Sequence, residues 1–230
     1  MGLVLESKGL TKRFDDLLVL DGIDLDIEEG ERLVILGPSG CGKTTFLRIV
    51  AGLAEPDSGK VKRGFKRLGY VFQSPTLIPW KSVLENLKYV LEDEERAKKI
   101  LKLVDLDGFE NNYPRELSWG MRQRVNLARA LMVEPDFVIL DEPFSSLDIP
   151  VKFRLMDDIL RFWNERSFTL LMVTHDIDEA LKMGDRIVVF SRRPARVLDV
   201  FSNVGDKGKM EEKLLRSLER AVGFKERIVD

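Results

Sequence analysis

The sequence predicts an α/β fold with a largely parallel sheet, an antiparallel β edge and an inserted helical subdomain. Four short apolar runs carry this prediction, at residues 33–36, 137–140, 170–173 and 187–190. Each is bounded by polar or turn residues, which is typical of strands buried on both faces of a parallel sheet. Helical patterns separate the runs, as expected when crossover helices connect parallel strands.

The remaining segments complete one predicted domain of 230 residues. Residues 3–9 and 18–27 are expected to form antiparallel edge strands, with a turn at the Asp-Gly pair of positions 21–22. Residues 75–135 have helical spacing without a buried-strand run, so a helical subdomain is predicted there, inserted into a core of residues 1–74 and 136–205. An amphipathic helix is expected at 209–222.

Composition narrows the classes of function. Lys and Arg (37) nearly balance Asp and Glu (39), and the net charge of −2 gives no electrostatic case for binding nucleic acid. The single cysteine, Cys41, excludes an internal disulfide and fits a reducing compartment. No apolar run exceeds four residues and the start lacks the pattern of a signal peptide. We therefore expect a cytosolic chain, or one that is bound to a membrane only through a partner.

Residues 37–45, "GPSGCGKTT", match the phosphate-loop pattern G-x-x-x-x-G-K-[ST] between a predicted strand and a predicted helix. Glycines let the backbone curl so that successive N–H groups point at phosphate oxygens, and the helix N-terminus favours negative charge. Lys43 is expected to reach the β- and γ-phosphates, and the Thr44 hydroxyl to ligate Mg²⁺. The predicted nucleotide-binding residues are Gly37, Pro38, Ser39, Gly40, Cys41 (through its backbone), Gly42, Lys43, Thr44 and Thr45.

A pair of acidic residues follows the run at 137–140. The strand would deliver Asp141 to the edge of the sheet where ligands of open α/β sheets bind, so Asp141 is expected to hold Mg²⁺ directly or through water. Glu142 is expected to act as general base on the attacking water. These motifs predict a Mg²⁺-dependent nucleotide hydrolase or kinase, and the absence of N-K-x-D argues against a Ras-like guanine reader.

Three further strings carry a family resemblance: "LSWGMRQR" (117–124), "SSLD" (145–148) and "THD" (174–176). With the phosphate loop they make residues 3 to about 200 resemble the nucleotide-binding subunit of an ABC transporter, which has a P-loop NTPase core of the ABC ATPase type. In that family two subunits pack head to tail, and the signature loop of each caps the γ-phosphate held by the other. The resemblance thus implies ATP and Mg²⁺ as ligands and a second copy of the chain as partner.

The resemblance also implies roles for particular residues. Ser118 and Gly120 would contact the partner's nucleotide, and Asp148 would cross the dimer seam. Gln73 would contact Mg²⁺ or the attacking water and link the core to the helical subdomain. His175, the only histidine, would contact the γ-phosphate and position Glu142 and water, alongside Lys43. Phe14 would stack on adenine, the alternative being an ordinary buried aromatic.

Trp119 departs from the usual L-S-G-G signature. If its side chain projects away from the phosphate, the replacement is harmless and Trp119 can pack against a partner. If the backbone there needs a positive φ, tryptophan would be strained. We expect activity to survive because the second glycine is intact.

The strings "FQSPTLIPWKSVLENL" and "SRRPARV" resemble the nitrate/sulfonate/taurine type of importer ATPase. That resemblance implies transmembrane permease subunits, indirectly a solute-binding protein, and a peripheral position on the cytoplasmic face of the membrane. Trp80 would lie near the face that meets the permease, or in the core of the helical subdomain. The alternative function is a soluble ABC ATPase that acts on nucleic acid, ribosomes or iron–sulfur assembly; a small-molecule kinase ranks third.

Overall fold

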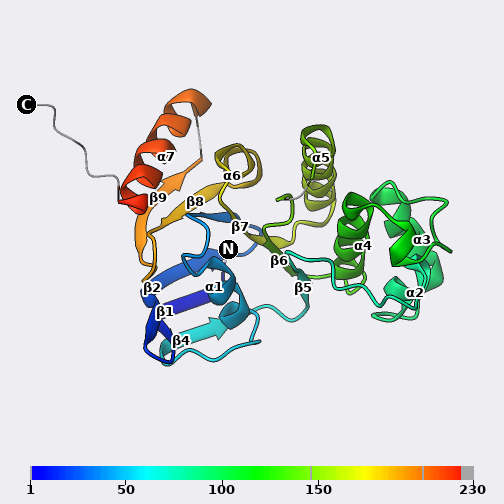
Figure 1. Cartoon of the computed structure of the whole chain (residues 1–230), viewed down its shortest axis with the longest axis horizontal. Helices are drawn as coiled ribbons and strands as arrows, with labels where there is room; N and C mark the ends of the chain where they lie inside the picture. The colour runs from blue at the N-terminus through cyan, green and yellow to red at the C-terminus, as the bar shows by residue number, and fades with distance from the viewer. Residues whose placement is uncertain (1, 146, 204, 224–230) are drawn as a thin grey trace, which may run out of the picture. The chain divides into compact units, whose positions relative to one another are not determined.

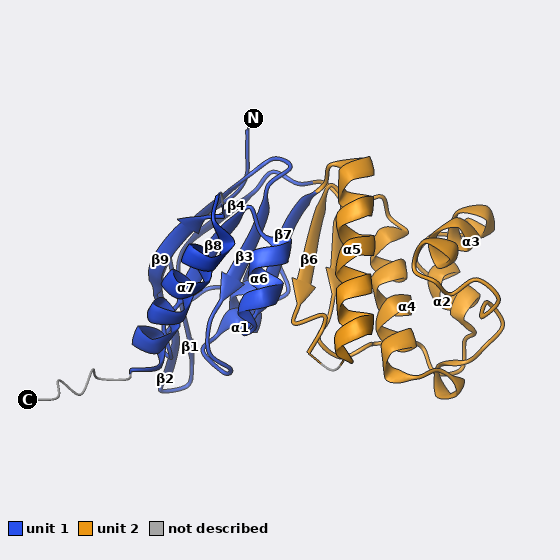
Figure 2. Cartoon of the chain, turned by 90° about the horizontal axis from the view of Figure 1, so that it is seen from above, with its two compact units in different colours: residues 1–65, 169–230 blue, residues 66–168 orange. Residues whose placement is uncertain are grey.

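The computed structural model describes residues 2–145, 147–203 and 205–223, and the chain divides into two compact units. The first comprises residues 1–65 and 169–230, and the second residues 66–168 (Figure 2). Among the described residues, no helix is both long enough and apolar enough to cross a bilayer.

The first unit contains a three-stranded antiparallel sheet in the order β2-β1-β4. Its strands are β1 (Leu3–Phe14), β2 (Leu17–Glu28) and β4 (Ser58–Arg63). The expected edge strands are therefore present, but the turn predicted at Asp21 and Gly22 is wrong. Both residues lie inside β2, where the ladder slips between Leu10↔Ile23 and Lys12↔Leu20 and Gly22 has a φ of 66°. This is a β-bulge, because one extra residue is accommodated on β2; the hairpin turns at Asp15, whose φ of 51° an aspartate tolerates.

The first unit also holds the strands that surround the phosphate loop. β3 (Arg32–Leu36) lies between β7 (Thr169–Thr174) and β8 (Arg186–Phe190), parallel to both, and β9 (Val197–Ser202) pairs antiparallel with β8. Three of the four apolar runs thus form buried parallel strands, as predicted. In the register Leu36 is opposite both Thr174 and Val189, so the three strands end at the same edge.

Three helices accompany these strands: α1 (Lys43–Val50), α6 (Ile177–Met183) and α7 (Lys207–Val222). α7 packs on α6, β8 and β9 (Figure 1). It is the predicted C-terminal helix, beginning two residues earlier than expected because the Asp206 side chain caps the N–H groups of Gly208 and Lys209.

The second unit pairs β5 (Leu68–Val71) in parallel with β6 (Phe137–Asp141), which is the fourth apolar run. Residues 75–135 contain α2 (Val83–Lys88), α3 (Glu94–Leu103), a 3₁₀ turn (Pro114–Glu116) and α4 (Trp119–Leu131), in line with their helical spacing; α5 (Ile149–Arg166) follows β6. Local capping explains several of the starts: Ser82 forms a capping box with Glu85, and the side chains of Asp93 and Ser118 accept from N–H groups of α3 and α4.

Candidate functional site

The phosphate loop leaves β3 and enters α1 through glycines that no larger residue could replace without strain. A Cβ at Gly37 would lie 3.2 Å from the carbonyl oxygen of Phe190. Gly40 and Gly42 have φ values of 73° and 125°, in the region that favours glycine. A Cβ at Gly42 would also lie 3.0 Å from side-chain carbons of Val19 and Leu20. The loop is therefore held tight by its surroundings.

The Lys43 ammonium group lies within this loop. Its Nζ donates to the carbonyl oxygens of Gly37, at 2.8 Å, and Pro38, at 3.1 Å, and the side chain is 4% exposed. A cation held this close to the loop carbonyls is positioned to meet the oxygens of a phosphate bound in the loop. Cys41 is buried at 2% exposure, and its sulfur packs towards Gly37, so its part in the loop is to fill space.

The N-terminus of α1 suits an anion. Its N-cap residue is Gly42, which makes no side-chain cap, and its first turn contains no acidic residue. The positive end of the helix dipole therefore faces the phosphate loop without a carboxylate of its own first turn to neutralise it. Thr44 and Thr45 lie in this first turn. The residues present fit a nucleotide phosphate chain.

His175 stands at the same edge of the strands as the phosphate loop. It is exposed and follows β7 directly, and the N–H of Gly37 donates to the carbonyl of Thr174 at 3.3 Å. Its turn is fixed by a buried pair that sequence reasoning missed: the Thr174 hydroxyl donates to the carboxylate of Glu179 at 2.6 Å and accepts from the N–H of Asp176 at 3.1 Å. The structure therefore brings His175 and the loop together.

Phe14 ends β1 with 51% of its surface exposed, which excludes the alternative that it is an ordinary buried aromatic. Lys12 Nζ lies 5.5 Å from the ring centroid. An exposed ring with a cation nearby remains suited to stacking on a base.

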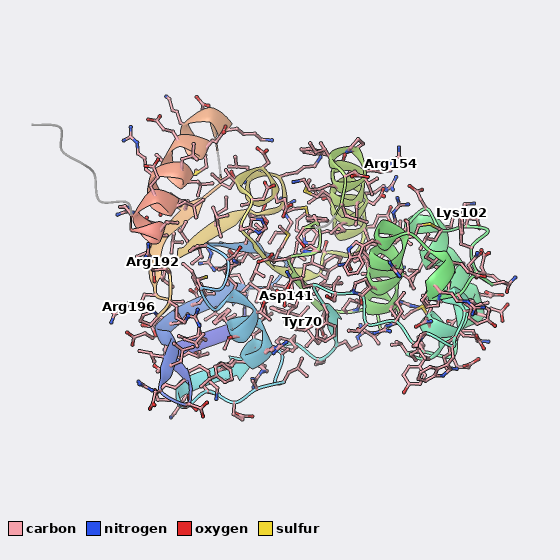
Figure 3. The ribbon with its side chains drawn as sticks, viewed as in Figure 1. Tyr70, Lys102, Asp141, Arg154, Arg192 and Arg196 are labelled. Carbon is pink, nitrogen blue, oxygen red and sulfur yellow. The ribbon has the colours of Figure 1, made fainter. Side chains whose placement is uncertain are left out.

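In the second unit, β6 delivers the acidic pair. Asp141 is 2% exposed and accepts a hydrogen bond from the Tyr70 hydroxyl at 3.3 Å; the two side chains come from neighbouring strands (Figure 3). Glu142 has a φ of 45°, in the left-handed region, and is the first residue after the strand. Gln73 Nε2 lies 3.5 Å from Glu142 Oε2. The structure therefore places close together the expected general base and the glutamine that is expected to contact Mg²⁺ or the attacking water. No pattern in the sequence marked Tyr70 as a residue of the site.

The backbone around Gln73 is held by two residues of α4 that sequence reasoning also missed. Gln123 Nε2 donates to the Gln73 carbonyl at 2.5 Å, and Asn126 Nδ2 donates to the Phe72 carbonyl at 3.1 Å. Both amides are buried. Their three-residue spacing marks one face of a helix, but nothing in the sequence indicates what that face contacts.

The signature segment forms the N-terminus of α4. Ser118 is the N-cap, and its Oγ accepts from the N–H of Met121 at 3.2 Å, which leaves its O–H as a donor. Trp119 is the first helical residue and does not have a positive φ, so the strained alternative is excluded. Its ring is 37% exposed and lies 5.5 Å from the Arg122 guanidinium. A Cβ at Gly120 would lie 3.2 Å from Leu147 Cδ2.

Two other predicted residues are exposed in the second unit. Asp148 is the N-cap residue of α5 but its carboxylate does not cap that helix. Trp80 is 76% exposed, so the reading that places it in the core of the helical subdomain is wrong.

Comparison with known proteins decides the family. The ABC transporter family matches residues 20–145, which is more than half of the chain. The chain belongs to the ABC transporter ATP-binding family. It is 42% identical over 219 residues to an uncharacterized ABC transporter ATP-binding protein of Methanocaldococcus jannaschii, with 87% of this chain and 82% of that protein covered. It is 39% identical over 212 residues to the aliphatic sulfonates import ATP-binding protein SsuB of Bacillus cereus, with 86% and 83% covered.

Solved structures agree with these relatives. A dimeric bacterial ABC transporter cassette is 30% identical and superposes with a TM-score of 0.80, covering 88% of this chain and 100% of its own. A dimeric post-hydrolysis state of such a cassette, bound to ADP and Pi, is 31% identical over the same shares, with a TM-score of 0.77. This chain is an ATP-hydrolysing enzyme with the fold of these cassettes.

Proposed function

We propose that this ABC ATPase energises a membrane importer of nitrate, sulfonate, taurine or a related small solute, through ATP-driven head-to-tail dimerisation. One observation carries the dimer: the chain has a second helix N-terminus built for an anion, at Ser118 and Gly120, in addition to the phosphate loop. A head-to-tail pair gives that second site a ligand, because it meets the nucleotide bound by the other copy. The dimeric cassettes among its structural relatives support this arrangement.

The site residues divide the chemistry among them. The phosphate loop and Lys43 bind and orient the triphosphate, and the ring of Phe14 stacks on the base. We assign Thr44, Gln73 and Asp141 to Mg²⁺, which would supply neutralising charge for the phosphate oxygens. The Glu142 carboxylate accepts the proton of the attacking water, and His175 donates a hydrogen bond to the terminal phosphate.

The tight arrangement around Asp141 favours its role as a metal ligand. A hydrogen bond from an outer residue fixes the orientation of a ligating carboxylate, and the Tyr70 hydroxyl makes such a bond to Oδ2. Because the Gln73 amide lies within 3.5 Å of Glu142, the carboxylate and the amide can share one water.

The import function rests on the relatives and on an exposed surface. The chain resembles ATP-binding proteins named for aliphatic sulfonate import. Trp80 and Tyr89 are 76% and 69% exposed, beside a groove lined by Lys81, Glu85, Lys88, Tyr89 and Glu92. We assign this surface to the permease, which would hold the chain at the cytoplasmic face of the membrane and connect it indirectly to a solute-binding protein. None of the relatives reported above supports the soluble alternative.

The test uses Glu142→Gln with and without Ser118→Arg. Removing the general base lowers turnover about 10²- to 10⁴-fold and leaves ATP bound. Light scattering of Glu142→Gln saturated with ATP and Mg²⁺ then gives the mass of a dimer, and adding Ser118→Arg returns the monomer while nucleotide binding to each chain is kept. A monomer under all conditions, even with the permease present, refutes the dimer.

Transport itself is tested by reconstituting the chain with a permease and solute-binding protein encoded beside it. Stimulation of ATP hydrolysis by a sulfonate or nitrate, with uptake of that solute, is the expected result. Hydrolysis that no permease stimulates, combined with salt-sensitive binding to RNA or DNA, would favour the soluble alternative.

A further inference from the structure

The backbone of residues 72–76, here called the Gln73 segment, is hydrogen-bonded to side chains of α4. Gln123 uses both ends of its amide: Nε2 donates to the Gln73 carbonyl at 2.5 Å, and Oε1 accepts from Asn126 Nδ2 at 3.3 Å. The same Asn126 nitrogen donates to the Phe72 carbonyl at 3.1 Å. One connected network of three hydrogen bonds therefore holds the two peptide groups on either side of the Gln73 Cα.

A third residue continues the same face of α4. Arg129 Nη1 donates to the Thr76 carbonyl at 2.7 Å, and Nη2 lies 3.3 Å from the Thr76 hydroxyl. Residues 123, 126 and 129 are spaced by three, so they form one stripe along the helix. The Gln73 segment thus lies along α4 and is hydrogen-bonded to it at both of its own ends.

The strand that leads into the segment lies directly against the same helix. A Cβ at Gly69 in β5 would lie 2.8 Å from the carbonyl oxygen of Ala130. The backbones approach this closely only because position 69 is a glycine. β5 is therefore in direct backbone contact with α4, and the Gln73 segment that follows β5 is hydrogen-bonded to the same helix.

Burial makes the network costly to open. Gln123 is 3% exposed and Asn126 is 1% exposed, so separating the segment from α4 breaks hydrogen bonds between groups that are shielded from water. The side chain of Gln73 differs: it is exposed, and its amide nitrogen lies 3.5 Å from the Glu142 carboxylate, at the long limit of a hydrogen bond. Its amide can turn towards or away from the carboxylate while its backbone stays fixed to the helix.

We propose that Gln123 and Asn126 are positioning residues for ATP hydrolysis, which make Gln73 and the N-terminus of α4 move as one body. The inference rests on the proposed function in one respect: Ser118 and Gly120, at that N-terminus, engage the nucleotide of the other copy. A displacement of α4 when the two copies meet is then carried to Gln73, and so to the water that Glu142 activates. Binding of the other copy's nucleotide at the N-terminus of α4 is thereby coupled, through the amides of Gln123 and Asn126, to the position of Gln73 in the chain's own site.

A double-mutant cycle between Asn126 and Gln73 tests this coupling. Asn126→Ala lowers ATP turnover about 10- to 100-fold, the scale of a small misplacement of a reacting group, and leaves nucleotide affinity of the isolated chain within about twofold. If Asn126 acts through Gln73, the double variant Gln73→Ala/Asn126→Ala turns over within about twofold of Gln73→Ala alone. Effects that multiply would show that Asn126 acts elsewhere and would overturn the proposal.

Two further variants separate positioning from general damage. Gln123→Met keeps the side-chain length but loses the donor to Gln73 and the acceptor for Asn126, so it reproduces the turnover defect without placing a charge in the buried network. Asn203→Ala is the matched control, because that amide also donates to two carbonyls, those of Leu181 and Gly184, but lies in the first unit. Asn203→Ala is expected to keep the turnover of the parent chain. If Asn203→Ala lost as much turnover as Asn126→Ala, the Asn126 effect would be explained by lost stability and the proposal would fail.

Hydrogen–deuterium exchange of the nucleotide-free chain gives a readout that does not depend on hydrolysis. Peptides covering 70–78 exchange at least about tenfold faster in Asn126→Ala and are unchanged in Asn203→Ala, because opening now breaks fewer bonds. Unchanged exchange in Asn126→Ala refutes the attachment. A parent chain that fails to dimerise on ATP would refute the proposed function instead, and the exchange result would still decide the attachment.

Discussion

Arg63 offers a sharp test of how the phosphate-loop helix is stabilised. α1 has only eight residues, too few to be stable alone, and its last turn leaves carbonyls to be satisfied from outside. Arg63 of β4 supplies the donors: Nε bonds the Val50 carbonyl at 2.7 Å and Nη2 bonds the Ile49 carbonyl at 2.5 Å. Its charge also complements the negative end of the helix dipole.

The magnitude follows from these two bonds. Hydrogen bonds from a charged donor contribute about 1.5–3 kcal/mol each when buried. Arg63 is largely exposed, so we expect Arg63→Ala to lower the free energy of unfolding by about 1–2 kcal/mol in total after solvent screening. For a chain of this size that corresponds to a fall in Tm of about 2–8 °C. Arg63→Lys keeps the charge but not the paired N–H donors of the guanidinium, so it should lower the free energy of unfolding by about half as much.

The assay is urea unfolding followed by circular dichroism, with Lys62→Ala as control. Lys62 is the neighbouring residue of β4 and makes an exposed ion pair with Glu6, at 3.0 Å, which solvent screens so that it contributes little to stability. An Arg63→Ala chain as stable as its parent, or a Lys62→Ala chain equally destabilised, would show that the guanidinium does not cap α1.

Three further substitutions have definite expected outcomes. Trp119→Gly should leave ATP turnover within about threefold, because Trp119 already has a helical φ, while lowering stability by about 0.5–1 kcal/mol through helix propensity; a large gain in turnover would show that tryptophan obstructs the signature. Phe14→Ala should weaken ATP binding about tenfold in a fluorescent-nucleotide titration while Phe14→Tyr keeps it, since stacking needs only the ring. Gly42→Ala should lower stability by about 1–3 kcal/mol in thermal melts, because its φ is 125° and the new Cβ would meet Val19 and Leu20 at 3.0 Å.

The local parts of the site could be predicted from the sequence because they depend on neighbours along the chain. Glycine spacing fixes the phosphate loop, and an apolar run followed by two acids fixes the end of β6. The same holds for His175, which follows an apolar strand, and for Ser118, which caps a helix. Family resemblance then supplied the roles of residues that carry no signal alone.

Other features depended on packing between distant segments. β4 consists mostly of polar residues and glycine, and pairing with β1 makes it a strand. The Asp-Gly pair at 21–22 has the composition of a turn, but the ladder with β1 makes it a bulge.

By itself, the sequence determined the fold class, the phosphate loop, the acidic pair and the family, because each prediction depends on motifs whose residues are close along the chain. Only the tertiary structure decided that Phe14 and Trp80 are exposed, that Trp119 is unstrained, and that α4 holds the Gln73 segment. The hydrogen bonds between α4 and the Gln73 segment join residues 50 or more positions apart. Which side chain meets which carbonyl at that separation is set by how helices and strands pack, and a local pattern does not contain that information.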